Sequence, residues 1–414
     1  MDLTILKIYY EYLYSMNIVH VTDQYWPSIS GVSVTVDAYI KEFTKMGHNV
    51  FLLAPEYPNA SEIDNKRNSS HLFRFKSYKV FFNVENRLVY RTQKSNIYKV
   101  LRSINPDIIH LHTEFAMGKM ASYYAKKFHI PLVITAHTNW EELITYYIPF
   151  MPSGFARIYC RWYMRKSYNK ADVVVVPTSL MGVLLKLYFV KPPIRVIPTG
   201  IDITEFSLTC SKEESNSQLF ESYPQLRGKK ILFFAGRIGT EKNITFLIDV
   251  LKELLPKNPN TILIICGDGP AIPEIKNYAK ECGVFENLLF TGFIERHKLK
   301  TYYSIADVFV IASKVESQGM VALESMACGT PVVAIGEMGT REVMGGDYGG
   351  FMVDKELEEF TEKVDLLLNN KSVHSLKSDE ALQHLSKWTI QSSAEKMFKL
   401  YTNLQKNRKS KDVK

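Results

Sequence analysis

The chain has few cysteines, and their arrangement predicts neither a disulfide framework nor a zinc finger. Five cysteines occur in 414 residues, and none stands in a Cys-x-x-Cys pair: Cys160, Cys210, Cys266, Cys282 and Cys328. Several of them lie in apolar runs, as Cys266 does at the end of TILIIC. We therefore expect buried free thiols in a protein of a reducing compartment.

Metal-binding patterns are also missing. No Asp-x-Asp pair occurs, and no histidine or cysteine cluster has the sequence spacing of a metal site. We therefore expect no metal ion and no cofactor. Any negative charge that develops during a reaction would then be stabilised by protein cations and backbone dipoles.

Long apolar segments are absent too. No stretch approaches 18 apolar residues, which argues against a membrane-spanning helix. The first fifteen residues carry Asp2, Lys7 and Glu11, and these charges interrupt the apolar core that a secretory signal requires. Met16 directly opens a strand-like run, so we interpret residues 1–15 as an N-terminal extension and Met16 as a candidate start. The expected location is the cytoplasm.

Charge is present but unevenly distributed. Residues 1–200 contain 24 lysines and arginines against 14 aspartates and glutamates, a net charge of +10. The remaining residues contain 27 against 29, a net charge of −2, within a total of +8. The basic character therefore belongs to the N-terminal half alone.

Short apolar runs alternate with longer amphipathic stretches along the whole chain. The runs are apolar throughout, as expected of strands buried on both faces of a parallel sheet: 17–22, 49–54, 107–111, 131–135, 172–177, 194–198, 230–235, 261–266, 287–291, 307–312 and 330–335. Helix-period stretches such as 33–46 and 319–328 supply the crossovers between them. This order predicts an α/β fold with two Rossmann-like, doubly wound parallel-sheet domains facing a central cleft.

The length also favours two domains, because 414 residues exceed one ordinary core. We expect them over residues 16–205 and 206–388. The polar segment 207–229 between them is interpreted as a hinge or exposed loop. A helix is expected over 389–405, either packing back on the N-terminal domain or staying with the second one, followed by a basic tail over 406–414.

The strongest motif holds two glutamates eight residues apart, Glu316 and Glu324. It follows an apolar strand and enters a helix, so Glu316 is expected in the loop and Glu324 on the helix. The backbone N–H groups of Gly319 and Met320 would then lie at a helix start, where anions and hydroxyl groups bind. Two glutamates at this spacing also fit a solvated helix face.

Three further candidates follow predicted strands. Arg237 and Lys242 lie in a strand-to-helix turn, where a guanidinium and an ammonium can meet a diphosphate. Gly31 follows the first strand, where a missing side chain lets backbone approach a phosphate. His137 ends another strand, in a position to hydrogen-bond a substrate. Each also has a simpler structural interpretation when taken alone.

Together these residues resemble family 4 of the glycosyltransferases, which are retaining enzymes of the GT-B fold. The two-glutamate motif is joined by G-R-x-x-x-E-K-N at 236–243, IPTGID at 197–202, GDGP at 267–270 and Ser-Gly-Val at 30–32. They occur in the family's order across residues 16–405. The resemblance implies that the first domain binds the acceptor and the second the nucleotide sugar.

A narrower resemblance concerns the substrate. The runs at 110–115, 137–142 and 313–320 look like those of bacterial diacylglycerol glucosyltransferases, which make membrane glycolipids. Related mannosyltransferases also carry the His-Thr-Asn-aromatic turn that begins at His137. The transferred sugar therefore stays open at this point.

The resemblance implies a role for each matching position. The implied catalytic residues are His137, near the 6-hydroxyl of the sugar, Glu316, on its hydroxyls, and Arg237 and Lys242, on the donor diphosphate. The implied donor-binding residues are Gly31 against the β-phosphate, Gly267 in the GDGP run, Phe293 and Ile294 at the nucleobase, Gly319 and Met320 on the sugar, and Glu324 on the ribose.

Two positions depart from the family pattern. Ser30 stands where the family usually has a second glycine, and Gln318 stands where phenylalanine is common.

The reaction that the resemblance implies is a front-face substitution in which the departing phosphate helps to deprotonate the acceptor. A retaining hydrolase would instead need a carboxylate nucleophile about 5 Å from its acid.

Basic and aromatic residues gather in two segments of the N-terminal half. Residues 74–102 hold eight lysines and arginines with six aromatics, and residues 157–170 hold five with no acid. Such segments attach to anionic lipid headgroups. Four residues are accordingly expected on the membrane or acceptor side: Trp140, Arg157, Arg161 and Arg165. A solvated basic face is the alternative, and no nucleic-acid-binding module is recognisable.

Three functions are therefore compared. The first is a retaining transferase that moves glucose from UDP-glucose to a lipid such as diacylglycerol, peripherally bound to the cytoplasmic face of an anionic membrane. The second is a GDP-mannose-dependent α-mannosyltransferase that acts on a lipid or a polysaccharide. The third is an inactive scaffold that binds nucleotide sugars, although the joint presence of the motif residues argues against it.

Overall fold

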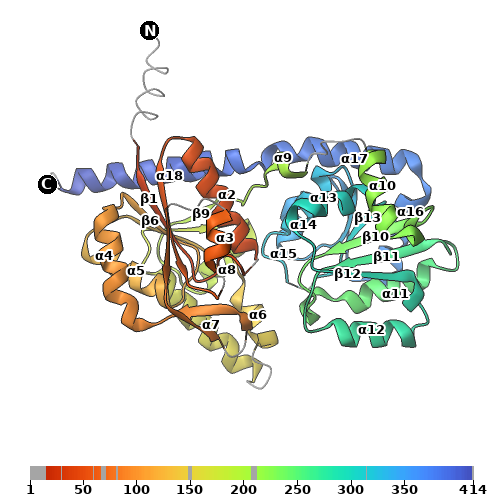
Figure 1. The fold of residues 1–414 in the computed structure, drawn as a ribbon, viewed down its shortest axis with the longest axis horizontal. Coiled ribbons are helices and arrows are strands. Elements are labelled where there is room, and N and C mark those ends of the chain that lie inside the picture. Colours follow the sequence, from red (N-terminus) through yellow and green to blue (C-terminus); the bar gives the residue numbers. More distant parts are fainter. Residues whose placement is uncertain are drawn as a thin grey trace, which may run out of the picture. The chain divides into compact units, whose positions relative to one another are not determined.

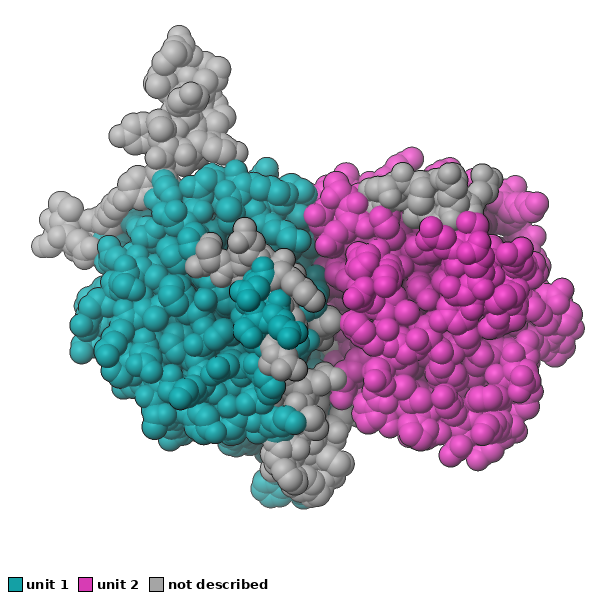
Figure 2. All heavy atoms as spheres, in the orientation of Figure 1, with its two compact units in different colours: residues 1–200, 390–414 teal, residues 201–389 magenta. Residues whose placement is uncertain are grey.

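The computed structural model describes residues 15–28, 30–58, 60–66, 71–80, 83–147, 152–206, 212–313 and 315–412. The chain divides into two compact units, coloured separately in Figure 2. Unit 1 comprises residues 1–200 together with 390–414, and unit 2 comprises residues 201–389. The expected N-terminal extension lies outside the described residues except for Ser15.

The described part of unit 1 contains a seven-stranded parallel sheet. Its spatial order is β3-β2-β1-β6-β7-β8-β9. The strands are β1 (Asn17–Val21), β2 (Asn49–Pro55), β3 (Leu72–Phe75), β6 (Ile108–Leu111), β7 (Leu132–Thr135), β8 (Val173–Val176) and β9 (Ile194–Val196). A separate antiparallel pair is formed by β4 (Ser77–Val80) and β5 (Asn83–Val89).

Helices pack against both faces of this sheet (Figure 1). One face packs on α4 (Lys94–Ile104), α5 (Ala116–Lys127), α7 (Ser153–Tyr168) and α8 (Ser179–Leu187). The other packs on α2 (Gly31–Lys45) and on the C-terminal helix α18 (Ile390–Asp412). The unit also contains α3 (Ala60–Lys66), the 3-10 turn η1 (Arg91–Gln93) and α6 (Trp140–Tyr147).

The C-terminal helix α18 belongs to unit 1 although it follows the whole of unit 2 in sequence. Its buried residues Ile390, Ala394, Met397 and Tyr401 recur at intervals of three and four, which places them on one face. That face joins Ile18 and other sheet residues in one apolar cluster, beside α2. Burial of this apolar stripe therefore explains why the chain returns to unit 1 after unit 2.

The described part of unit 2 contains a six-stranded parallel sheet in the order β12-β11-β10-β13-β14-β15. The strands are β10 (Lys230–Ala235), β11 (Thr261–Cys266), β12 (Leu288–Gly292), β13 (Val308–Ile311), β14 (Val332–Ile335) and β15 (Gly350–Val353). Successive residues of β10 enter different clusters on the two faces, with Phe233 in one and Phe234 in the other. The strand is buried on both sides, as its continuous apolar run predicts.

Two layers of helices cover this second sheet. One layer contains α9 (Ile203–Phe206), α10 (Lys212–Ser222), α13 (Arg296–Ile305), α14 (Met320–Ala327), α15 (Met338–Met344) and α17 (Lys371–His384). The other contains α11 (Ile244–Leu254), α12 (Ile272–Glu281) and α16 (Leu357–Asn369). Short 3-10 turns complete the unit: η2 (Pro224–Leu226), η3 (Thr240–Lys242), η4 (Phe285–Asn287) and η5 (Leu385–Lys387).

Both units confirm the predicted doubly wound parallel sheets, but one local expectation is wrong. Residues 212–222 form helix α10 rather than a hinge or loop, and Leu219 of this helix is buried in the unit 2 core. The expected basic tail continues as helix up to Asp412. Residues 212–222 are rich in polar residues, and Leu219, the one buried position among the described side chains of α10, is too weak a sequence signal to reveal the helix.

Candidate functional site

The strand order of unit 2 places the ends of β10 and β13 side by side. From β10 the chain adds strands in one direction, through β11 to β12, and from β13 it adds them in the other. Such a reversal is the point where ligands bind, at the carboxyl ends of the strands in doubly wound sheets. Lys242 follows β10 and Glu316 follows β13, so both lie at this switch point.

Lys242 and Glu316 form an ion pair there. Lys242 Nζ donates to Glu316 Oε1 at 2.5 Å, and both side chains are mostly buried. Arg237, in the same turn as Lys242, lies 3.4 Å from Glu241 Oε1 and keeps 38% of its side chain exposed. The structure therefore pairs Lys242 with Glu316 of the predicted set and places Arg237 in the same turn as Lys242.

The loop between β13 and α14 is held closely against a neighbouring turn. Gly339 N donates to the carbonyl oxygen of Glu316 at 3.0 Å. A Cβ atom on Gly339 would lie 2.4 Å from the backbone of Gln318, so only glycine permits this approach. Gly319 has a φ of +83° and begins α14 without a side-chain cap. The first N–H groups of α14, including that of Met320, are thus suited to an anion or a hydroxyl group.

Glu324 is buried inside unit 2 and already has two protein partners. Arg296 Nη1 donates to Oε1 at 2.5 Å, and Tyr303 Oη donates to Oε2 at 3.0 Å. Arg296 also pairs with Glu205 Oε2 at 3.2 Å. Each carboxylate oxygen has a second lone pair, so Glu324 can still accept from a ribose hydroxyl. The sequence did not reveal Arg296 and Tyr303, because an arginine in a polar run is indistinguishable from a solvated one.

The other predicted donor residues of unit 2 differ in their surroundings. Gly267 has a φ of +136°, and a Cβ atom there would lie 1.9 Å from the carbonyl oxygen of Gly236. Packing between two turns therefore suffices to explain this glycine. Phe293 is 56% exposed, whereas Ile294 packs against the unit 2 core.

Unit 1 repeats the same strand order, with its switch point between β1 and β6. Gly31 begins α2 directly after the β1 loop, and the cap is formed by Ser30 and Ser33. Ser33 N donates to Ser30 Oγ at 3.2 Å, and Ser30 N donates to Ser33 Oγ at 2.8 Å. A Cβ atom on Gly31 would meet nothing within 4 Å. No packing contact of the described residues therefore requires glycine at this position.

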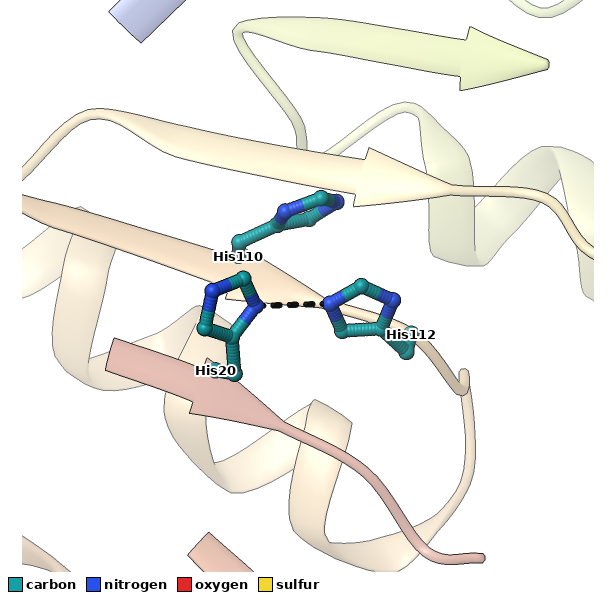
Figure 3. Close-up of side chains that lie close together, drawn as sticks. All are labelled: His20, His110 and His112. Carbon is teal, nitrogen blue, oxygen red and sulfur yellow. Dashed lines mark hydrogen bonds between the residues drawn. The ribbon is translucent and has the colours of Figure 1, made fainter. Parts of the chain in front are cut away.

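A chain of imidazoles runs from the switch point of unit 1 to His137. His20 on β1 and His110 on β6 are register partners, and His112 follows β6 (Figure 3). His20 Nδ1 lies 2.8 Å from His112 Nε2, and His112 Nδ1 lies 2.9 Å from His137 Nε2. His137 follows β7, so three neighbouring strands supply the chain.

Burial keeps these imidazoles uncharged near neutral pH. Desolvation lowers the pKa of His20 to about 3 and that of His137 to about 4. The pKa values of His110 and His112 lie well below 6.5, first because of burial and then because neighbouring histidines would repel a second charge. Only His137 is partly exposed.

The three histidines of Figure 3 were also considered as a metal centre, because one nitrogen of each lies within 4.8 Å of the others. A tetrahedral zinc ion needs N–Zn bonds of about 2.0–2.1 Å, which separates its ligand nitrogens by more than 3 Å. His20 and His112 are closer than that, at a hydrogen-bond distance. His110 is already bonded to Tyr401 Oη and Thr135 Oγ1, each at 2.6 Å. The geometry fits a hydrogen-bond chain and does not fit a zinc site.

Sequence reasoning missed this cluster, because its histidines do not have the sequence spacing of a metal site. The available signal was the His-x-His pair at the end of an apolar run, since alternate residues of a strand share a face. Register with His20 on a strand about 90 residues earlier could only be seen in the folded sheet.

The residues predicted on the membrane or acceptor side lie on α6 and α7. Arg161 donates from Nε to Glu141 Oε2 at 2.9 Å, so its charge is paired. Arg157 and Arg165 are exposed on the same helix. Trp140, at the start of α6, packs edge-on against Phe115 at 5.3 Å.

Before and between these arginines α7 exposes large apolar side chains. Phe155 is 73% exposed and Trp162 is 51% exposed, and Ile158 and Tyr159 are also open to solvent. Beside them, Phe189 is 71% exposed under the guanidinium of Arg165, whose central carbon lies 5.8 Å from the ring centre. Within the described ranges, no helix has both the length and the apolar content needed to cross a membrane.

Comparison with known proteins gives two matching family models, one for each half of the chain. The model "Glycosyltransferase Family 4" matches residues 29–205, and "Glycosyl transferases group 1" matches residues 216–385. The second interval contains both glutamates of the motif and its pairing lysine.

Several relatives and solved structures are similar over most of the chain. An alpha-monoglucosyldiacylglycerol synthase of Streptococcus pneumoniae is 32% identical over 76% of this chain and 70% of its own length. One of Acholeplasma laidlawii is 29% identical over 75% of this chain and 78% of its own. The crystal structure of Anabaena Alr3699/HepE in complex with UDP and glucose has a TM-score of 0.74 at 16% identity, and the match covers 94% of this chain and 100% of that one. The fold is therefore GT-B, and the protein is an enzyme of the group 1, family 4 glycosyltransferases.

Proposed function

We propose that this enzyme transfers a hexose with retention, glucose from UDP-glucose, to a lipid acceptor such as diacylglycerol at an anionic membrane surface. The main support for a lipid acceptor is the exposed apolar and basic face of α7. It agrees with the similarity to two alpha-monoglucosyldiacylglycerol synthases.

The switch point of unit 2 supports a nucleotide-sugar donor. Arg237 and Lys242 lie in one turn, and the uncapped start of α14 adds backbone N–H groups. Cations and helix-start amides stabilise a departing diphosphate because they are already oriented toward the site where charge develops. Glu316 holds Lys242 in place and, with the N–H of Met320, accepts and donates hydrogen bonds at the sugar hydroxyls.

The reaction then needs no carboxylate nucleophile. The bond between the sugar C1 and the β-phosphate oxygen breaks, and the acceptor hydroxyl oxygen bonds to C1 on the same face. The hydroxyl proton passes to the departing phosphate oxygen. His137 contributes a hydrogen bond to the sugar, and Gly31 gives the phosphate room.

The α7 face supports delivery of a lipid acceptor. Phe155, Ile158, Tyr159 and Trp162 are exposed on a helix whose cations include Arg157 and Arg165. Aromatic rings bury into the headgroup region while the arginines contact anionic headgroups. The second basic and aromatic segment, residues 74–102, was also expected to bind membrane. It contains β4, β5 and α4, and residues 81 and 82 between the two strands lie outside the described residues.

A donor and acceptor screen tests the transfer. Purified enzyme is incubated with UDP-glucose or GDP-mannose and with vesicles with and without diacylglycerol, and nucleotide release and the lipid product are measured. We expect UDP release that depends on diacylglycerol and an α-linked product by NMR. GDP release would favour the mannosyltransferase, and nucleotide binding without turnover would favour the inactive scaffold.

A flotation assay tests the membrane face separately. We expect the wild type to float with anionic vesicles and not with neutral ones. The double variant Arg157→Glu/Arg165→Glu should float at least tenfold less, because it replaces attraction by repulsion. Lys252→Glu/Lys257→Glu, two exposed positions of unit 2, makes the same change in net charge and should float like the wild type. Equal loss in both variants would contradict a specific α7 surface.

A further inference from the structure

The imidazole chain of unit 1 ends in the core on one side and in a partly exposed residue on the other. At the buried end, His20 stacks on Phe43 with ring centres 5.9 Å apart and on Tyr39 at 6.5 Å. Its Nε2 atom is buried and has no hydrogen-bond partner among the described residues. At the other end, His137 bonds to His112 through Nε2, which leaves Nδ1 for a ligand.

Neutral imidazoles have one donor nitrogen and one acceptor nitrogen, so the hydrogen bonds of such a chain must all run in the same direction. Either His137 donates to His112 and His112 to His20, or His20 donates to His112 and His112 to His137. The first direction puts an N–H on His20 Nε2, inside an apolar pocket. The second puts only a lone pair there.

The second direction is favoured by the cost of burial. A buried N–H without an acceptor is rare in folded proteins, and it loses the full energy of its hydrogen bond to water. An unused lone pair on an aromatic nitrogen beside two rings is less costly, because acceptors are more often left under-satisfied than donors. His20 Nδ1 therefore donates to His112 Nε2, and His112 Nδ1 donates to His137 Nε2.

We propose that His20 and His112 are positioning residues that fix His137 as the Nδ1–H tautomer, so that His137 presents a hydrogen-bond donor to an oxygen of the bound donor substrate. The tautomer follows from the chain itself, whereas the identity of the accepting oxygen rests on the proposed function. An acceptor nitrogen at this position would repel a phosphate or carbonyl oxygen. The device thus decides which ligand atoms His137 can hold.

His110 lies beside this chain and has no part in it. Its two nitrogens bond to Tyr401 and Thr135, whose hydroxyl groups adapt to either tautomer. Tyr401→Phe, a buried change on α18, is therefore a matched control that disturbs a neighbouring histidine and leaves the direction of the chain intact.

The tautomer is measured directly by two-bond nitrogen–proton correlation spectra of the full-length protein labelled with ¹⁵N-histidine, with His137→Gln used to assign the signal of His137. We expect the Nδ1–H pattern at His137 in the wild type and in Tyr401→Phe. We expect its loss in favour of Nε2–H in His112→Leu, because this variant removes the donor that the chain directs at Nε2. Nε2–H in the wild type would overturn the proposal.

Turnover supplies the second measurement. Asparagine at position 112 can place an amide N–H where His112 has Nδ1–H, whereas leucine has a similar shape and no donor. We expect kcat to fall about tenfold or more in His112→Leu and to stay within about threefold of the wild type in His112→Asn. Equal losses in the two variants, at equal thermal stability, would reduce His112 to a packing residue and contradict the proposal.

Two outcomes separate this inference from its alternatives. Elemental analysis that finds one zinc ion per chain, removed by His20→Phe, would overturn it, because both nitrogens of the His20–His112 pair would then face a metal. The spectra need no substrate, so they report the tautomer even if no donor is turned over. An inactive protein with the Nδ1–H pattern would contradict the proposed function and leave the positioning device standing.

Discussion

The switch point of unit 1 gathers neutral imidazoles, whereas that of unit 2 gathers Arg237 and Lys242 with their paired carboxylates, Glu241 and Glu316. The strand order is the same in both sheets apart from the additional edge strand β9 of unit 1, so topology sets where these side chains meet. Burial sets their charge. His20 and His112 are fully enclosed and uncharged, while Lys242 and Glu316 keep some contact with solvent and pair as ions.

The difference suits two tasks of one transfer reaction. In the proposed reaction a departing diphosphate needs positive charge, which Arg237 and Lys242 of unit 2 would supply. Glu241 of the same turn pairs with Arg237, and Glu316 after β13 pairs with Lys242. Orientation of a sugar in the proposed reaction needs directed hydrogen bonds, which the uncharged imidazoles of unit 1 would supply without attracting counter-ions. Substitutions in either unit can test this difference between the two switch points.

The largest effect is expected from Lys242→Met, which removes the paired cation of unit 2. We expect kcat to fall by about 10²–10³-fold, as when one group that stabilises developing negative charge is lost. The measurement is UDP release with circular dichroism as the test of folding. Lys298→Met removes a lysine from an exposed pair with Glu295 and should leave the rate unchanged. A rate for Lys242→Met within threefold of the wild type would remove Lys242 from the site.

Glu324→Gln should weaken unit 2 itself. The change leaves the charge of Arg296 without its buried partner, and we expect a loss of about 3 kcal/mol in the free energy of unfolding. Urea titration measures it. Glu205→Gln removes the more exposed partner of the same arginine, so the expected loss is below about 1 kcal/mol. Similar losses in both variants would show that burial does not distinguish these carboxylates.

His20→Phe should change how stability depends on pH. Burial lowers the pKa of His20 to about 3 from 6.5, so its neutral form stabilises the fold above pH 6.5 and this contribution is lost as pH falls toward 3. We expect the wild type to lose about 2 kcal/mol more than the variant between pH 7 and pH 5.

The pH dependence of the free energy of unfolding must be compared between the wild type and His20→Phe, because two buried acids of unit 1 change stability in the opposite direction. Burial raises the pKa of Glu114 to about 7 and that of Asp23 to about 6, so their contributions increase as pH falls. They are present in both proteins and cancel in the difference. Equal slopes for His20→Phe and the wild type would place His20 outside the buried, uncharged cluster.

The smallest effect is expected from Gly31→Ala. Alanine has room there and favours a helix, so thermal stability should stay equal or rise slightly. If a phosphate approaches this backbone, the added methyl group should lower kcat/KM for the donor about tenfold. An unchanged kcat/KM would mean that the glycine serves only the start of α2.

Much of the fold followed from hydrophobic pattern, because strands buried on both faces must be apolar throughout. The run TILIIC is β11, and the motif that contains Glu316 lies after β13 as expected. The pattern did not reveal β3 and β15, whose partly buried residues do not form such runs, or helix α10.

The candidate site likewise combines features that the sequence predicts with contacts that only the fold creates. The pairing of Lys242 with Glu316 follows from motifs that each end a strand, but their contact depends on β10 and β13 being neighbours although 72 residues separate Ala235 from Val308 in the chain. Arg296 and Tyr303 gave no local signal, since each acquires its role only from the partner it meets.

The amino-acid sequence by itself determined the α/β class, the two sheets and the family, because these depend on local periodicity and on motifs read in order along the chain. Tertiary structure alone decided that α18 returns to unit 1, that Glu324 is enclosed by Arg296 and Tyr303, and that His20, His112 and His137 form one chain. The reason is physical: burial and hydrogen bonding between distant residues depend on strand order, which no short segment encodes.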